Sequence, residues 1–509
     1  MTETKASGTI DIGKRENVHK LNTKAVGVVG VLFLTVTGAA PESAMLGNVP
    51  FAAGFGNGMH TPAAFLLATI VLVIFSIGYA TMASRVSSVG GFYAFISQGL
   101  GREIGMSAGL TALVCYSIFE ASLYGLFAYF ANIWLSTHLG LNIGWVWLAL
   151  AALIGAGILS VRDVKLSTAV LGTAVLLETI VLLVFAFGVI FAPKGTSFSL
   201  EALNVFHVTI PVAAQKVGAV SIPAGAAAVG IFMAFWSWVG FEMAPNYAEE
   251  SRDPKRIVPL SLYISVIFLG VFYTIVSWCG ISAYPNEGAM LAQAVNDSGN
   301  FFLTPMKQFV GPLGYQALSF LILTSSFACG MAFHNTAARY MYSLGREGVL
   351  PHHFGKTHDI ARSPHVASIV QSCLAAIWIL LFGLFNGFNN PMDQAYLGIY
   401  TLYAVLGTGL LLVLQAFVSL AIWNYFRKAG GGSFLKTVLA PWISFFVQIW
   451  LVYLLVTNLV TFAGTTAFAN ALPFIGGAVI VIGLIWGFVL KHVNPQAYKH
   501  IGHMVHEID

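Results

Sequence analysis

Long apolar windows dominate the sequence and constrain its fold more than any other feature. Each is long enough to cross a hydrocarbon core of about 30 Å, which takes about 20 helical residues. Within a membrane every backbone N–H and C=O must be satisfied by the protein, so these windows predict an all-α polytopic membrane protein. The twelve predicted spans are residues 25–53, 62–84, 104–136, 144–161, 166–192, 222–250, 258–284, 312–345, 364–386, 394–426, 435–462 and 470–491.

Charged residues are too few to cover a water-exposed surface of this size. Asp, Glu, Lys and Arg make up 9% of the 509 residues, whereas soluble proteins carry about 25%. The net charge of +4 is too small to indicate a nucleic-acid partner. No catalytic, phosphate-binding or metal-ligand motif is present. We therefore expect a protein surrounded by membrane lipid that is not an enzyme and holds no metal.

Lys and Arg gather on one side of the predicted spans. If the N-terminus is cytoplasmic, only Lys194, Lys216 and Lys307 of the 24 Lys and Arg fall outside. This positive-inside distribution predicts a multi-pass protein of the cytoplasmic membrane with both termini in the cytoplasm. The sequence leaves the oligomeric state open.

Two of the spans contain helix-breaking residues near their middle. The first is interrupted by Gly38–Glu42 and the sixth by Gly240–Pro245. Proline removes a backbone donor, and glycine tolerates unwound backbone. Two such breaks, about 200 residues apart, indicate inverted repeats around a binding site at the middle of the membrane.

Several motifs resemble those of the amino acid–polyamine–organocation (APC) transporters. They are Met82–Tyr93, Gly99–Gly105, Phe235–Glu242, Ala248–Pro259 and Ala338–Pro351. The resemblance covers helices one to ten in order. It implies a LeuT-like fold, in which two inverted five-helix repeats are followed by two peripheral helices. It also implies secondary transport of amino acids or amines by alternating access.

This fold divides the chain into six parts. We expect a cytoplasmic tail (1–24), a first five-helix repeat (25–192), an extracellular loop (193–221), a second repeat (222–426), two peripheral helices (435–491) and a cytoplasmic C-terminal tail (492–509).

The resemblance also implies where a substrate binds. In such transporters the amides of the first break hold the substrate carboxylate, and carbonyls of both breaks face its ammonium group. The usual Gly-Ser-Gly reads Gly38-Ala39-Ala40 here, and the following Pro41 offers no N–H. This departure weakens the case for carboxylate binding. Amines that lack a carboxylate therefore remain candidate substrates. The predicted substrate-binding residues are Gly38, Ala39, Ala40, Glu42, Glu120, Trp236, Ser237 and Gly240.

Charged side chains inside a membrane are costly, so glutamates within the spans are functional candidates. There are four of them: Glu42, Glu120, Glu178 and Glu242. We predict that Glu178 and Glu242 couple transport to protons, with sodium as the alternative coupling ion and no other cofactor. Glu178 falls where many proton-coupled relatives carry a lysine. Glu242 is either a proton-linked gate or a cap for the broken helix. Glu120 is either a counter-ion for a substrate amine or a partner of another helix.

These features leave three hypotheses for the function. The first is a proton-coupled symporter of an amino acid. The alternative is a transporter or exchanger of a decarboxylated amine or polyamine, which the excess of buried acids favours. A third is a membrane sensor that binds the same substrate without transporting it.

Overall fold

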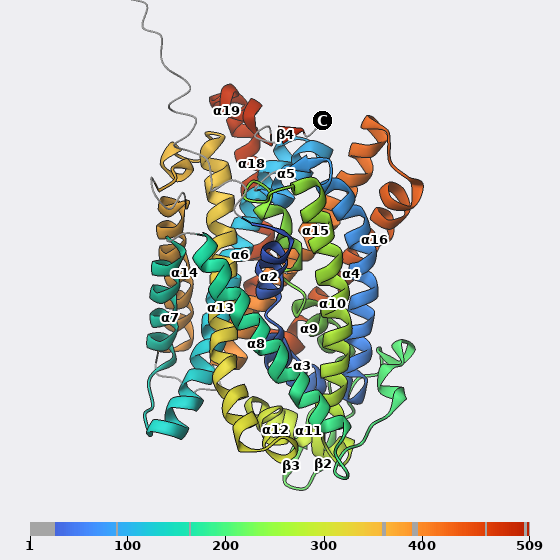
Figure 1. The fold of residues 1–509 in the computed structure, drawn as a ribbon. Helices are drawn as coiled ribbons and strands as arrows, with labels where there is room; N and C mark the ends of the chain where they lie inside the picture. Colours follow the sequence, from blue (N-terminus) through green and yellow to red (C-terminus); the bar gives the residue numbers. More distant parts are fainter. Residues whose placement is uncertain are drawn as a thin grey trace, which may run out of the picture.

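The computed structural model describes residues 26–87, 90–161, 164–358, 363–388, 395–463, 466–502 and 506–507. The predicted N-terminal tail, residues 1–24, lies outside them. The described chain is almost entirely helical, which confirms the predicted all-α class. Its long helices run side by side between two ends (Figure 1). The C-terminal elements lie at one end, and α11, α12, β2 and β3 lie at the other.

The element bounds are as follows. The longer helices are α2 Val28–Ala39, α3 Pro41–Ala52, α4 Thr61–Ala83, α6 Arg102–Leu139, α7 Trp145–Ser160, α8 Val164–Ile190, α9 Ala227–Trp236, α10 Pro254–Ser282, α13 Pro312–Arg346, α14 His365–Asn386, α15 Thr401–Ala429, α16 Ala440–Thr457 and α18 Ala467–Val493. The shorter helices are α5 Gly91–Leu100, α11 Glu287–Asn296, α12 Leu303–Phe309, α17 Leu459–Ala463 and α19 Pro495–His500. The tighter or wider helical segments that matter below are η2 Ala53–Asn57, η3 Gly58–His60, η4 Leu200–Leu203, η5 Val205–His207 and η6 Phe241–Tyr247.

Among the described residues, 10 helical segments are long and apolar enough to cross a membrane. The first, Val28–Ala83, covers most of both of the first two predicted spans. Helix α7 coincides with the fourth predicted span, but its 16 residues are fewer than a full crossing takes. The polytopic architecture is therefore confirmed, and the count of twelve crossings stays a prediction.

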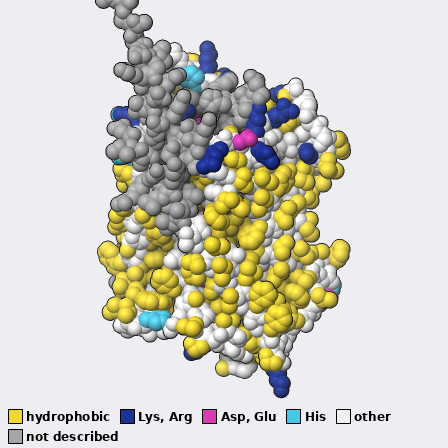
Figure 2. All heavy atoms as spheres, in the orientation of Figure 1, with side chains coloured by type: hydrophobic (Ala, Val, Ile, Leu, Met, Phe, Trp, Pro, Cys, Tyr) yellow, Lys and Arg dark blue, Asp and Glu magenta, His cyan; other side chains and the backbone are white. Residues whose placement is uncertain are grey.

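The outer surface matches a membrane environment. Hydrophobic side chains cover a broad central band of the molecule, and Lys and Arg gather mainly near the end that carries the C-terminal elements (Figure 2). Large apolar side chains on this surface, such as Phe187, Phe268 and Phe446, are exposed. Exposure of this kind is expected where lipid rather than water is the solvent.

The loop after α8, predicted as residues 193–221, extends to residue 226 and contains regular structure. It contains η4, η5 and an antiparallel hairpin of β2 (Gln215–Val217) and β3 (Val220–Ile222). Because residues 220–222 pair as a strand, helix α9 begins at Ala227 and not at the predicted residue 222. A second strand pair joins β1 (Val86–Ser87) to β4 (His506–Glu507) in the C-terminal tail.

Helix α6 lies at the centre of the bundle. It packs against α13, α15, α18, α5 and α7, whereas α2 packs against α8, α10 and η6. The two interrupted helices also pack against each other, α2 against η6 and α3 against α9.

Candidate functional site

The first break lies between α2 and α3, where the sequence predicts it. Ala40 separates the two helices with φ 41° and ψ 77°, and it is the one non-glycine residue with positive φ among the described residues. Its N–H donates to the carbonyls of Val36 (2.9 Å) and Thr37 (3.1 Å), which closes the last turn of α2. Pro41 then starts α3, because its missing N–H and fixed φ suit a first helical position.

The second break lies between α9 and η6. Gly240 has φ 118°, a conformation that favours glycine, and η6 continues with Pro245 inside it. The Glu242 carboxylate accepts a hydrogen bond from the Gly240 N–H (2.9 Å) and another from the Tyr116 hydroxyl (2.8 Å). The Tyr79 hydroxyl donates to the Glu242 carbonyl (3.1 Å). Glu242 therefore caps the broken helix, one of the two roles considered for it, and proton coupling through it stays a prediction.

The two breaks touch each other. A Cβ atom on Gly240 would lie 2.2 Å from the carbonyl carbon of Gly38, and one on Gly38 would lie 3.1 Å from the Gly240 Cα. Only glycine at position 240 allows the two unwound segments to approach this closely. The close approach makes both breaks walls of one space.

That space is a small cavity of about 20 Å³ with both polar and apolar walls, which is enough for about one water molecule. Five predicted substrate residues line it, namely Gly38, Ala39, Ala40, Trp236 and Ser237. Glu42, Glu120 and Gly240 are not among its lining residues. Substrate binding by the five stays a prediction. The rest of the lining is Ser43, Ala44, Asn48, Leu123, Val239, Cys329, Phe333 and Tyr400.

A ring of hydrogen bonds connects three elements around this cavity. The Asn48 amide donates to the Ser237 hydroxyl (2.8 Å) and accepts from the Tyr400 hydroxyl (2.7 Å). The Trp236 indole N–H donates to the same Tyr400 oxygen (2.8 Å). Sequence analysis missed Asn48 and Tyr400. The one signal for Asn48 was a polar side chain in an apolar span, and nothing in the sequence connects Tyr400 to the breaks.

The N-terminus of α3 is already occupied by side chains of the protein. The Ser43 N–H donates to the Ser325 hydroxyl (3.1 Å), which in turn donates to the Glu178 carboxylate (2.8 Å). The Glu42 backbone N–H also lies near enough to Glu178 to stabilise its carboxylate. Glu178 thus places a carboxylate where the dipole of α3 and its free amides favour an anion. Ser325 was not predicted.

Glu42 lies close by in an unusual setting. Its side chain is fully buried, and neither carboxylate oxygen has a hydrogen-bond partner among the described residues. Glu178 is near enough to interact with it electrostatically. Two carboxylates this close in a dry site disfavour joint ionisation. A proton or a cationic ligand would relieve the repulsion between them.

Glu120 points away from the cavity. Its carboxylate contacts His334 Nδ1 (2.9 Å) and accepts from the Gln371 amide (2.7 Å). His334 Nε2 in turn lies 2.8 Å from the Ser368 hydroxyl and 3.0 Å from the Ser160 hydroxyl. This network joins α6, α13, α14 and α7 and matches the second of the two roles considered for Glu120, while substrate binding by Glu120 stays a prediction.

Two ion pairs fasten the end of the second broken helix to α13. Arg339 bonds to Glu250 (2.8 Å), and its guanidinium lies 4.6 Å above the Tyr247 ring. Arg346 pairs with Glu249 (2.9 Å) nearer the surface. The first pair is almost fully buried, so moving the segment after η6 away from α13 would separate two charges that hold each other inside the protein.

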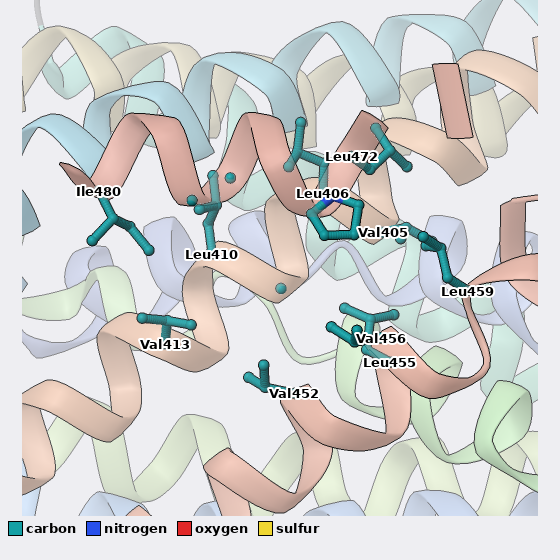
Figure 3. Close-up of a pocket in the computed structure, with 14 residues that line it drawn as sticks. Val405, Leu406, Leu410, Val413, Val452, Leu455, Val456, Leu459, Leu472 and Ile480 are labelled. Carbon is teal, nitrogen blue, oxygen red and sulfur yellow. The ribbon is translucent and has the colours of Figure 1, made fainter. Parts of the chain in front are cut away.

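Two larger cavities do not suit a charged substrate. One, of about 230 Å³, lies between α15, α16 and α18, and its labelled Val, Leu and Ile side chains surround the space (Figure 3). The other, of about 780 Å³, lies between α6, α8 and α13 and is lined mainly by Leu, Phe and Ala. Both linings are almost wholly apolar, so they offer few hydrogen-bond partners to an ammonium or carboxylate group.

The broken helices, the buried acids and the apolar surface define the class as a multi-pass membrane transporter. A family model described as amino acid permease matches residues 26–489. The chain belongs to this family, and the predicted APC relationship is confirmed.

Individual relatives are more distant. The low-affinity putrescine importer of Escherichia coli (strain K12) is 24% identical over 63% of this chain and 67% of its own length. Cationic amino acid transporter 4, vacuolar, of Arabidopsis thaliana is 24% identical over 74% of this chain and 61% of its own. The aspartate-proton symporter of Bacillus subtilis is 26% identical over 35% of this chain and 34% of its own.

Proposed function

We propose that this permease is a secondary active transporter that carries a small amino acid or amine by alternating access. The observation that carries the proposal is the contact of the two breaks at Gly38 and Gly240, beside a cavity that several polar side chains line. Unwound backbone inside a membrane is tolerated where it faces protein or a ligand. Paired breaks of this kind supply both dipole ends to a substrate.

Protons are the coupling ion in this proposal, with Glu178 as the main carrier. One Glu178 oxygen accepts from Ser325, and the other has no partner among the described residues. A carboxyl group in this position can hold a proton without losing its contact with α3. The aspartate-proton symporter among the relatives supports proton coupling. Sodium stays the alternative.

A substrate without a carboxylate is a second candidate, and one observation favours it. Few backbone donors at the first break are open to a ligand: the Ala40 N–H bonds within α2, the Ser43 N–H donates to Ser325, Pro41 has none, and the Glu42 N–H lies near Glu178. An amino acid carboxylate would have to displace Glu178 or Ser325. An amine would not, and the putrescine importer among the relatives supports this candidate.

A thermal-shift experiment with matched pairs separates the two candidates. The purified protein is heated with an amino acid or with its decarboxylated amine, such as ornithine beside putrescine. A ligand that binds only the folded state adds RT ln(1 + [L]/Kd) of stability. Stabilisation by the amines alone supports the second candidate, and stabilisation by the amino acids alone removes it.

Uptake into proteoliposomes tests transport itself. Accumulation of the stabilising ligand against its gradient, driven by an inward proton gradient, supports proton-coupled transport. Binding without accumulation would instead support the membrane sensor. We place the protein in the cytoplasmic membrane with both termini in the cytoplasm, because the Lys and Arg asymmetry favours that topology.

A further inference from the structure

A cluster of metal-ligating side chains lies outside the substrate site, at the turn that joins α3 to α4. His60, at the end of η3, meets Glu201 and His207 from the loop after α8. Each offers one ligand atom, and these three atoms lie within 4.8 Å of one another. The His207 Nδ1 contacts a Glu201 carboxylate oxygen, and the two imidazole rings lie 5.6 Å apart.

The surroundings hold these side chains in place. His60 is 8% exposed, and its Nδ1 lies 3.3 Å from the Glu201 carbonyl. The Asn204 amide donates to the Glu201 carboxylate (3.0 Å). Ordered ligands with hydrogen-bonded neighbours lower the cost of assembling a metal site. The side chains of Glu201 and His207 are each 46% exposed, which leaves a path for an ion.

The donor set indicates the kind of ion. Imidazole nitrogens suit Zn²⁺, Cu²⁺ and Ni²⁺, whereas Mg²⁺ and Ca²⁺ prefer oxygen ligands. Two histidines and one glutamate form a Zn²⁺ ligand set that leaves a fourth position for water. A dication would also neutralise the Glu201 carboxylate that now faces only neutral or weakly basic partners in the cluster.

We propose that His60, Glu201 and His207 bind Zn²⁺ and thereby fasten the loop to the end of the first broken helix. The same loop is already attached there through the backbone. The Val212 N–H donates to Gly56 (2.9 Å), and the Ala226 N–H donates to Phe55 (2.9 Å). The metal adds a side-chain connection to this seam, so Zn²⁺ stabilises the folded transporter.

Calorimetric titration of ZnCl₂ into the full-length, tag-free protein tests the site. The His207→Ala and Glu201→Gln variants each remove one ligand. His207 and Glu201 are partly exposed, so both variants should fold. His138→Ala is the matched control, because His138 is another exposed histidine outside the cluster. We expect Zn²⁺ affinity to fall at least tenfold in both ligand variants and to stay unchanged in the control.

Two results of the Zn²⁺ titration would overturn the proposal. Equal Zn²⁺ affinity in the wild type and the His207→Ala variant overturns the proposal, because the binding would then come from other histidines. Absence of binding in the wild type also overturns it. Co²⁺ gives an independent readout, since tetrahedral coordination produces strong visible absorption. That absorption should appear in the wild type and the control and be lost in His207→Ala, and MgCl₂ should produce no thermal shift.

Discussion

Gly240 packs so closely on Gly38 that a single added carbon would lie 2.2 Å from the Gly38 carbonyl carbon. The two breaks of the permease therefore meet as bare backbone. Gly240 also has φ 118°, so a side chain there would meet both a clash and a strained backbone.

We expect Gly240→Ala to abolish uptake and to lower stability by roughly 2–4 kcal/mol, because strain and overpacking add. Thermal unfolding and proteoliposome uptake measure the two effects. Gly477→Ala in α18 is the control, since a Cβ there meets nothing within 4 Å. Normal uptake by the Gly240→Ala variant would mean that the breaks do not need to touch.

Substitution of Ala40 by glycine should not destabilise the protein, in contrast to Gly240→Ala. Its left-handed backbone costs an alanine about 1–2 kcal/mol, so Ala40→Gly should leave the melting temperature unchanged or raise it. Ala44→Gly, one turn into α3, should lower it, because glycine inside a helix costs about 1 kcal/mol. A fall of equal size in both variants would contradict the strained geometry at Ala40.

Glu178→Gln should remove the dependence of uptake on the proton gradient and spare substrate binding. The amide keeps the size of the carboxyl group but cannot carry a proton. Uptake with and without a pH gradient, together with a thermal-shift titration, measures both properties. Ser325→Ala is the control that disturbs the same hydrogen bonds and keeps the acid. Unchanged gradient dependence in Glu178→Gln would exclude this residue as the proton carrier.

Glu120→Gln tests whether Glu120 acts on the substrate or on the scaffold. Because Glu120 bonds to His334 and Gln371, we expect a loss of about 1–3 kcal/mol of stability from a disturbed buried network. Affinities for neutral and cationic ligands should change by the same factor. A selective loss of cationic ligands would restore the counter-ion role.

The buried pair of Arg339 and Glu250 should matter more than an exposed pair. Arg339→Gln removes the buried positive charge that lies 2.8 Å from Glu250 and should cost about 3–5 kcal/mol. Lys491→Gln breaks the exposed contact with Glu103 and should give no measurable change. Urea or thermal unfolding of both variants in detergent compares them. Equal stability of the two variants would show that Arg339 contributes nothing beyond a surface charge.

Local chemistry predicted the positions of both breaks. Proline and glycine act on the backbone of their own helix. Pro41 and Gly240 therefore predict an interruption regardless of how the helices pack. The apolar spans could likewise be predicted, because a helix that crosses lipid must be apolar whatever it packs against. The start of α9 could not be predicted, because residues 220–222 become a strand only by pairing with residues 215–217.

The sequence could not predict which side chains on different helices contact each other. Glu120 and Leu123 are three residues apart on α6, yet Leu123 lines the cavity and Glu120 faces His334. Which face points where depends on the rotation of α6 against its neighbours, and no local pattern records it. The cluster of His60, Glu201 and His207 could not be predicted for the same reason, since His60 and Glu201 are 141 positions apart in the sequence.

The volume of the cavity has a consequence for how ligands are recognised. A space for about one water cannot admit an amino acid or a diamine. If the substrate binds between the two breaks, as proposed, it must therefore bind another conformer and shift the population toward it. If that conformer makes up about 1% of the molecules, the measured Kd is about 100-fold weaker than the intrinsic one. Substitutions that loosen this closed form should then raise apparent affinity without adding any contact to the ligand.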